Sequence, residues 1–115
     1  MYRAKYISPM IPSFMMEKTI LFFKDLLQFE PIFNSGNYVI LSKNDLTLHL
    51  LTAGEDIGQM EFYLEVDDIN SIWIYIKDKL GQIKHKSPHD REYGMREIHI
   101  AVPGTNTLLF IGQEI

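Results

Sequence analysis

Cysteine is absent from this chain of 115 residues, and so is any long hydrophobic run. The lack of cysteine excludes disulfides, thiolate metal sites and a cysteine nucleophile, and it agrees with a cytoplasmic location. No segment approaches the roughly 20 apolar residues of a transmembrane helix, so we expect no membrane partner. Pro9 and Pro12 interrupt the apolar N-terminal stretch, and no small-residue cleavage site follows it, so we expect no signal peptide.

Clustered positive charge is also missing. The 11 Lys and Arg residues are scattered and are outnumbered by 15 Asp and Glu residues, which gives a formal net charge of −4. Nucleic-acid binding needs a basic surface that displaces counterions, so we expect no nucleic-acid partner. A mildly acidic chain is compatible with a cationic ligand, although this charge is common among proteins. Glycine-rich phosphate loops and G-x-S-x-G motifs do not occur.

The residues that are present indicate one ordinary globular domain over residues 1–115. Hydrophobic residues make up 46% of the chain and charged residues 23%. Apolar spacing in the first half predicts one helix, because Ile20, Phe23 and Leu27 recur at helical intervals, and it predicts strands where apolar residues alternate. The predicted elements are a strand over 7–13, a helix over 17–29, a short strand over 31–33, and strands over 38–41 and 46–51.

The second half repeats this order after a polar linker over residues 52–59. Asp67 and Asp68 provide helix caps and Gly81 a helix end. The predicted elements are a strand over 62–66, a helix over 69–80, a short strand over 82–86, a loop over 88–94, and strands over 95–102 and 107–111. The stretches FFKDLL (22–27) and YIKDKL (75–80) support a duplication, with modules at about 5–53 and 59–115. The alternative is a ferredoxin-like or other α+β domain without duplication.

Four stretches of the sequence carry a family resemblance over nearly the whole chain. They are PMIP (9–12) with FFKDLLQF (22–29), LTLHL (46–50), EFYLEVDDI (61–69), and YGMRE (93–97) with FIGQ (110–113). In this respect the chain resembles the vicinal oxygen chelate superfamily, which is the glyoxalase/bleomycin-resistance/dioxygenase family, and in particular its bleomycin-resistance-like branch. The turn VPGTN (102–106) departs from the D-P-D-G-N usual there.

The resemblance implies an α+β fold in which two βαβββ modules form a cupped mixed sheet around a cavity. It also implies a homodimer, with domain swapping between the subunits as one form of it. Catalytic members of the family hold a divalent metal on their first, fourth, fifth and eighth strands. The corresponding residues here are Pro9 or Met10, Thr47 or His49, Glu61, and Leu109. Two ligands at most remain, fewer than the three of a catalytic site, so we expect no metal and no cofactor.

Seven residues are the predicted ligand-binding set of the cup: His49, Glu61, Tyr63, Tyr38, Tyr93, Arg96 and Leu109. Aromatic walls and some negative charge suit a large aromatic cation. The wall candidates are Phe33, Tyr38, Tyr63, Trp73, Tyr75, Tyr93 and Phe110, although Trp73 and Tyr75 fall on opposite sides of a helix. Arg96 has two open roles, binding an anionic group or pairing structurally. We expect no functional role for His85, for His89 in a solvated loop, or for His99 on a strand that faces solvent.

The leading hypothesis is a metal-independent small-molecule binding protein with no catalytic residue, a role that includes sequestration of an aromatic or cationic antibiotic. The alternative is an enzyme of the same superfamily. It would be a metal-dependent lyase, isomerase or dioxygenase with a non-standard site, or a metal-free variant with Glu61 or His49 as general base. A third hypothesis is an accessory domain that only dimerises, with its cavity filled by its own side chains.

Overall fold

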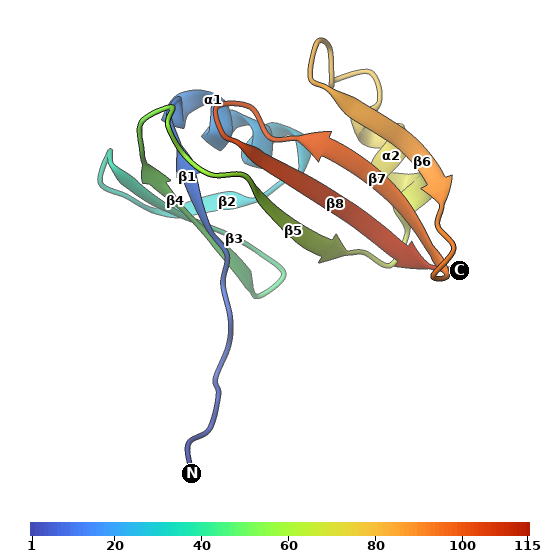
Figure 1. Cartoon of the computed structure of the whole chain (residues 1–115), viewed down its shortest axis with the longest axis horizontal. Coiled ribbons are helices and arrows are strands. Elements are labelled where there is room, and N and C mark those ends of the chain that lie inside the picture. Colours follow the sequence, from blue (N-terminus) through green and yellow to red (C-terminus); the bar gives the residue numbers. More distant parts are fainter.

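The computed structural model describes residues 1–115 and confirms the duplicated order of strand, helix and three strands. The first half contains β1 (Met10–Ser13), α1 (Met16–Leu21), the π-helical segment η1 (Phe22–Leu26), β2 (Glu30–Asn34), β3 (Tyr38–Lys43) and β4 (Leu46–Thr52). The second half contains β5 (Met60–Glu65), α2 (Ile69–Ile76), β6 (His85–Asp90), β7 (Met95–Ala101) and β8 (Thr107–Glu114). Figure 1 shows the two halves side by side.

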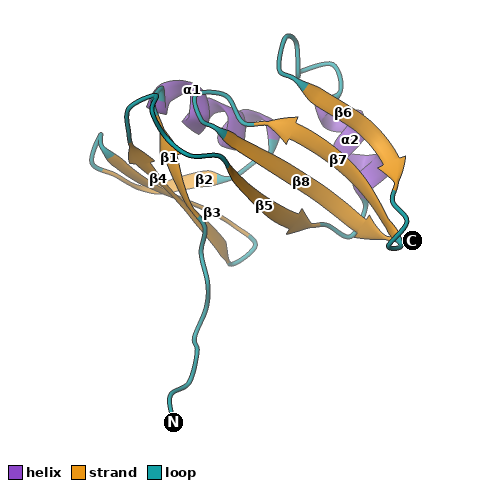
Figure 2. Ribbon diagram, viewed as in Figure 1, coloured by secondary structure: helices purple, strands orange, loops and turns teal.

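Each half forms its own four-stranded mixed sheet. Sheet A has the strand order β1-β4-β3-β2, and sheet B has the equivalent order β5-β8-β7-β6 (Figure 2). The first strand of each half runs parallel to the last one, while the remaining pairs are antiparallel. A parallel pair needs a long crossover, which the helix of each half supplies.

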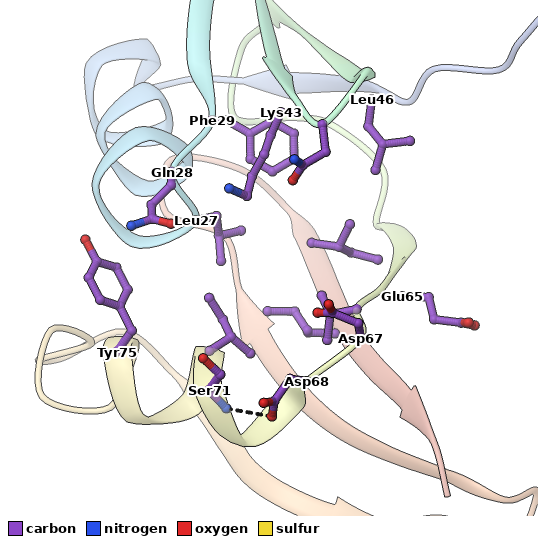
Figure 3. Close-up of a pocket in the computed structure, with 15 residues that line it drawn as sticks. Leu27, Gln28, Phe29, Lys43, Leu46, Glu65, Asp67, Asp68, Ser71 and Tyr75 are labelled. Atoms are coloured by element: carbon purple, nitrogen blue, oxygen red, sulfur yellow. Dashed lines mark hydrogen bonds between the residues drawn. The ribbon is translucent and has the colours of Figure 1, made fainter.

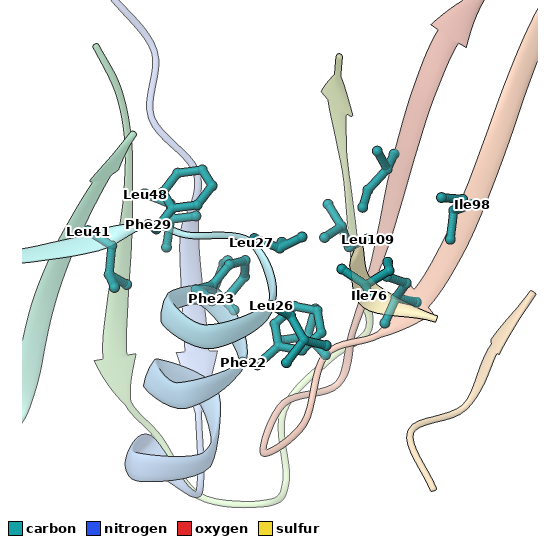
Figure 4. Close-up of a cluster of buried hydrophobic side chains, with 14 of the residues drawn as sticks. Phe22, Phe23, Leu26, Leu27, Phe29, Leu41, Leu48, Ile76, Ile98 and Leu109 are labelled. Carbon is teal, nitrogen blue, oxygen red and sulfur yellow. The ribbon is translucent and has the colours of Figure 1, made fainter. Parts of the chain in front are cut away.

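One face of each sheet is buried in a single hydrophobic core. Side chains alternate along a strand, so Leu48 and Leu50 of sheet A and Ile98 and Ile100 of sheet B point inward. Figure 4 shows α1 and η1 packed between the strands of the two sheets. The other face of each sheet carries no helix. We call these the open face of sheet A and the open face of sheet B, and within one chain they point away from the shared core.

The two halves are joined by contacts between the β1–α1 connection and the β7–β8 turn. The amide of Phe14 donates to the carbonyl of Gly104 over 2.8 Å, and the hydroxyl of Thr19 donates to the carbonyl of Pro103 over 2.7 Å. The rings of Phe23 and Phe62 lie 6.4 Å apart in the core. The halves therefore form one continuous body.

The N-terminal strand and the first helix are shorter than the sequence predicts. Strand β1 begins at Met10 rather than at Ile7, and residues 1–7 extend away from the body as an arm without helix or strand (Figure 1), while Ser8 and Pro9 are hydrogen-bonded to β4. The expected helix over 17–29 is divided into α1 and η1, and it ends at Gln28, whose φ is +61°. A left-handed residue at this point terminates the helix and directs the chain into β2.

The sixth strand is the largest difference from the prediction. The sequence predicts a strand over 82–86 and a loop over 88–94, whereas β6 spans His85–Asp90 and contains Pro88. Proline is tolerated here because β6 is an edge strand, and its pairing with β7 is irregular between Lys86 and His89.

No helix of the structure has the length and apolar character needed to cross a membrane.

Candidate ligand-binding faces

The open face of sheet A brings together two of the predicted site residues. Tyr38 on β3 and His49 on β4 lie side by side, with the phenolic oxygen 2.5 Å from His49 Nδ1 and the rings edge to face. Met10 is the register partner of His49 on β1 and is 50% exposed, and Phe33 on β2 is 51% exposed. This face therefore combines a polar pair with uncovered apolar side chains.

The open face of sheet B holds two more predicted residues, Glu61 and Tyr63. They alternate with the core residues Phe62 and Leu64 along β5. The ring of Tyr63 lies against the backbone of Gly112 on β8, where any side chain would collide with it. Burial raises the pKa of the Tyr63 hydroxyl, and the negative charges of Glu97 and Glu65 raise it further.

Carboxylates outnumber the basic side chains on and beside the open face of sheet B. Strand alternation and register place four of them there: Glu61, Glu65, Glu97 and Glu114. The basic residues next to this face are Lys84 and Lys86, which line a pocket with His99 and Leu108, and Arg91 in the β6–β7 turn. The face therefore has the sign of charge that attracts a cation.

Glu97 is the buried centre of a polar network that the sequence did not reveal. Its side chain is 1% exposed; Tyr93 donates its hydroxyl to Oε2 over 2.6 Å, and His99 Nε2 lies 2.8 Å from Oε1. Burial opposes ionisation of Glu97, but the hydrogen bonds from His99 and Tyr93 and the nearby Arg91 outweigh it, so its pKa lies below its ordinary value. The same hydrogen bond from Tyr93 raises the pKa of the Tyr93 hydroxyl.

Two histidines that the sequence placed in solvent belong to this network. His99 faces the open side of sheet B beside Phe110, with ring centroids 4.1 Å apart, and its side chain is only 14% exposed. His89 lies on β6 rather than in a solvated loop, and its ring meets that of His99 edge to face at 4.7 Å. The expected exposure of both residues was wrong. For His99 the sequence did contain a signal, because residues 97 and 99 are two apart on one strand and therefore share one face of it.

The remaining predicted site residues lie apart from the open faces or at their margin. Tyr93 is in the β6–β7 turn and reaches the face through Glu97. Arg96 points to the opposite side of β7 from Glu97 and makes two hydrogen bonds to Asp90, at 2.7 and 3.2 Å. This pair lowers the pKa of Asp90, chiefly through the hydrogen bond from Arg96, which supports the structural role of Arg96.

Leu109 does not line the cup. It is 0% exposed and belongs to the shared core, because it sits on the helix-facing side of β8. The residues of β8 that face the open side are Leu108 and Phe110, the register partners of Glu61 and Tyr63. The assignment of the family's eighth-strand position to Leu109 was wrong by one residue, and a shift of one residue moves a side chain to the other face of a strand.

The donor set at the chelating positions of the family does not fit a metal ion. On sheet A, the register pair at these positions is Met10 with His49. On sheet B, it is Glu61 with Leu108. Each pair offers one imidazole or carboxylate ligand beside a side chain that cannot bind a hard divalent ion. Three protein ligands are normal for a catalytic site, and these four positions supply two.

Two of the aromatic candidates are on the helix side of sheet B and do not line an open face. Trp73 packs against the core, with its ring 6.0 Å from that of His85. Tyr75 lies on the other side of α2 and donates its hydroxyl to the carbonyl of Asp25 over 3.2 Å. The assignment of one of these two aromatic residues to core packing is confirmed for Trp73.

A pocket of about 770 Å³ lies between the two halves at the start of α2 (Figure 3). None of the seven predicted site residues lines it. One of its three acidic residues has a local structural role, since Asp68 caps α2 by accepting from the amide of Ser71 over 3.1 Å. The predicted site residues that the structure brings together are therefore on the open faces rather than in this pocket.

Comparison with known proteins identifies the fold. No protein-family model and no curated protein matches the sequence. Among solved structures, the bleomycin resistance determinant encoded on the transposon Tn5 matches with a TM-score of 0.81 and 21% identity, covering 96% of this chain and 98% of that one. A bleomycin-binding protein complexed with bleomycin matches with a TM-score of 0.80 and 21% identity, covering 97% and 100%.

A lyase shares the same architecture. Lactoylglutathione lyase from Agrobacterium tumefaciens matches with a TM-score of 0.77 and 16% identity, covering 96% of this chain and 95% of that one. The resemblance seen in the sequence is confirmed at the level of the fold, since matches of this length and similarity include both binding proteins and enzymes. The chain has the fold of the bleomycin-resistance and glyoxalase proteins.

Proposed function

We propose that this protein is a homodimeric small-molecule binding protein that holds an aromatic cation, such as a bleomycin-like antibiotic, without a metal at the chelating positions of the family. The observation that carries the proposal is the composition of the two open faces. The open face of sheet A presents uncovered apolar side chains, among them Phe33, and the open face of sheet B presents Tyr63 beside carboxylates. Burial of apolar surface supplies affinity, and aromatic faces and carboxylates favour a cation.

Dimerisation explains how two outward-pointing faces can build one crevice. Because α1 and η1 pack between the sheets, the open faces of one chain do not enclose a common space. In a symmetric dimer, the open face of sheet A of one protomer meets the open face of sheet B of its partner, which gives two equivalent crevices. The exposed arm over residues 1–7 carries Tyr6 and Ile7, which are 71% and 94% exposed, and an exchange of this arm would cover them.

Binding of two probes tests the function directly. We expect bleomycin and ethidium, a planar aromatic cation, to raise the melting temperature, because a ligand specific for the folded state stabilises it by mass action. We expect Tyr63→Leu and Glu61→Gln each to weaken binding by about three- to tenfold, from the loss of an aromatic contact or a charge. Isothermal titration calorimetry in the presence of a chelator measures the affinity.

Matched variants on the helix side control for indirect effects. Tyr75→Leu and Glu17→Gln remove the same groups away from the open faces, and we expect both to leave probe affinity unchanged. The proposal fails if neither probe binds the wild type, or if the helix-side variants weaken binding as much as those on the open face of sheet B.

One observation favours the enzyme alternative. The hydroxyl of Tyr38 is hydrogen-bonded to His49, and an imidazole positioned in this way can act as a general base. Mass spectrometry of each probe after incubation separates the two functions. A binding protein returns the probe with its mass unchanged, whereas an enzyme produces a new species that disappears in His49→Gln.

A further inference from the structure

His89, Glu97 and His99 form a compact group on strands β6 and β7 of sheet B. One ligand atom from each residue lies within 4.8 Å of the others. These strands are the second and third of their module, whereas the chelating positions of the family lie on the first and last strands. The group is therefore separate from the positions at His49 and Glu61.

The imidazole of His89 presents an unsatisfied acceptor to this group. Its Nδ1 lies 2.8 Å from the carbonyl oxygen of Ser87, which can only accept, so Nδ1 carries the proton. In the neutral ring, Nε2 then carries the lone pair. This Nε2 is buried and has no hydrogen-bond partner. Buried polar atoms are normally paired, so an orphaned imidazole nitrogen beside a carboxylate requires an explanation.

The other two residues are already held in place as metal ligands usually are. Tyr93 donates to Glu97 Oε2 over 2.6 Å and so orients the carboxylate, leaving Oε1 directed at His99 Nε2 over 2.8 Å. Phe110 packs against the His99 ring. Hydrogen bonds from outer residues that fix the ligands are typical of metal sites in proteins.

We propose that His89, Glu97 and His99 bind one divalent transition-metal ion of the zinc class. Two imidazole nitrogens and one carboxylate oxygen are the ligand types that such ions prefer, and three protein ligands leave a further position open. Binding replaces the hydrogen bond between His99 Nε2 and Glu97 Oε1, and any proton carried by Nε2 must leave that nitrogen for the solvent or for Nδ1. Arg91 Nη1, 3.9 Å from Glu97 Oε1, moves away from the carboxylate as the cation enters.

The distances within this largely buried group are close to those around a bound ion. Bonds of about 2.1 Å place tetrahedral ligand atoms about 3.4 Å apart, so the widest pair closes by at most about 1.4 Å. The half-buried His89 ring provides this movement by rotation about its side-chain torsions. Of the three residues, His99 also lines a pocket of about 440 Å³, so the His99 ring separates this pocket from the buried carboxylate of Glu97.

Metal titration of the chelator-stripped protein tests this site without reference to any organic ligand. We expect Zn²⁺ to bind in a 1:1 ratio and to raise the melting temperature, and Co²⁺ to give the visible absorption of a four- or five-coordinate ion. We expect His89→Gln and His99→Gln to weaken Zn²⁺ binding by roughly a hundredfold or more, because two ligands hold the ion poorly. Tyr93→Phe should weaken it by about tenfold, as loss of an outer partner does.

Two histidine variants outside the group are the controls. His85 lies on the same strand, with its Nδ1 directed at the carbonyl of Ile83, and His49 is the imidazole at the chelating positions of the family. We expect His85→Gln and His49→Gln to bind Zn²⁺ like the wild type. The proposal is overturned if the wild type takes up no stoichiometric Zn²⁺, if His89→Gln and His99→Gln bind it normally, or if His49→Gln loses it. None of these results depends on whether ethidium or bleomycin binds.

Discussion

The ring of Tyr63 occupies the space above Gly112, and this contact links two residues of the open face of sheet B. A Cβ at position 112 would collide with the Tyr63 hydroxyl, which is the far end of a mobile side chain that is 44% exposed. We expect Gly112→Ala to displace the ring at a stability cost of less than about 1 kcal/mol. The same change should lower ethidium affinity by about three- to tenfold, the value of one aromatic contact.

Chemical denaturation and calorimetric titration of Gly112→Ala measure the two effects separately. Gly58→Ala is the matched control, because a Cβ at position 58 meets nothing within 4 Å in the linker between the halves. Unchanged ethidium affinity in Gly112→Ala would show that the position of Tyr63 does not matter for binding.

The sequence predicted the positions of individual side chains correctly where the alternation along a strand was assigned to the right face. Glu61 and Tyr63 were expected to share a face, and the structure places them together on β5. The same alternation, shifted by one residue on β8, assigned Leu109 to the cup in place of its neighbours. The network around Glu97 was missed although its residues are close in sequence, because residues 88–94 were predicted to be a loop, whereas β6, its turn and β7 form a hairpin that brings His89 and Tyr93 to Glu97.

At the scale of elements, the β7–β8 turn is the connector that ties the two halves together. The Gly104 carbonyl accepts hydrogen bonds from the Phe14 amide and the Ser13 hydroxyl, and its φ is +75°. A Cβ here would lie 2.7 Å from Thr19 Oγ1 and 2.8 Å from the Met15 carbonyl oxygen. Both the backbone angle and the close approach therefore require glycine.

We expect Gly104→Ala to lower the free energy of unfolding by about 2 to 5 kcal/mol, from left-handed strain and steric overlap together. Urea denaturation followed by circular dichroism measures it. Gly94→Ala isolates the first contribution, because Gly94 has φ +83° but open space around its Cβ position. If both variants lose the same stability, the close packing of the two halves at this turn is not important for folding.

The order of elements could be predicted from the sequence because it follows from local signals. Asp68 caps α2 as expected, and Asn44 and Asp45 adopt the left-handed turn between β3 and β4. The position of β6 could not be predicted in this way. Its polar, proline-containing sequence resembles a loop, and it becomes a strand because β7 offers it an edge to pair with.

At the scale of the whole molecule, the outward direction of the two open faces makes a second chain necessary for a closed crevice. The sequence resemblance predicted the cup but not this arrangement, because the packing of α1 and η1 between the sheets is a tertiary feature. If a crevice combines sheet A of one protomer with sheet B of its partner, damage to the two faces can be complemented by mixing protomers.

We expect a dimer by light scattering, and we expect two binding-deficient variants to restore each other when mixed. One variant carries Phe33→Ala and His49→Leu on sheet A, and the other carries Glu61→Gln and Tyr63→Leu on sheet B. In a mixed dimer, one crevice receives both damaged faces and the other receives both intact ones. Random reassortment makes half of the dimers mixed, so about one crevice in four should bind ethidium with wild-type affinity.

Reassortment requires unfolding and refolding the two variants together, and each variant refolded alone is the control. Crevices built within one chain would give no recovery on mixing, because every chain would keep one damaged face. A monomeric protein would give the same result and would also appear as a single chain in light scattering, so the two measurements together identify which part of the arrangement is wrong. Recovery to about one quarter requires sheets from two chains, since no arrangement within one chain joins an intact sheet A to an intact sheet B.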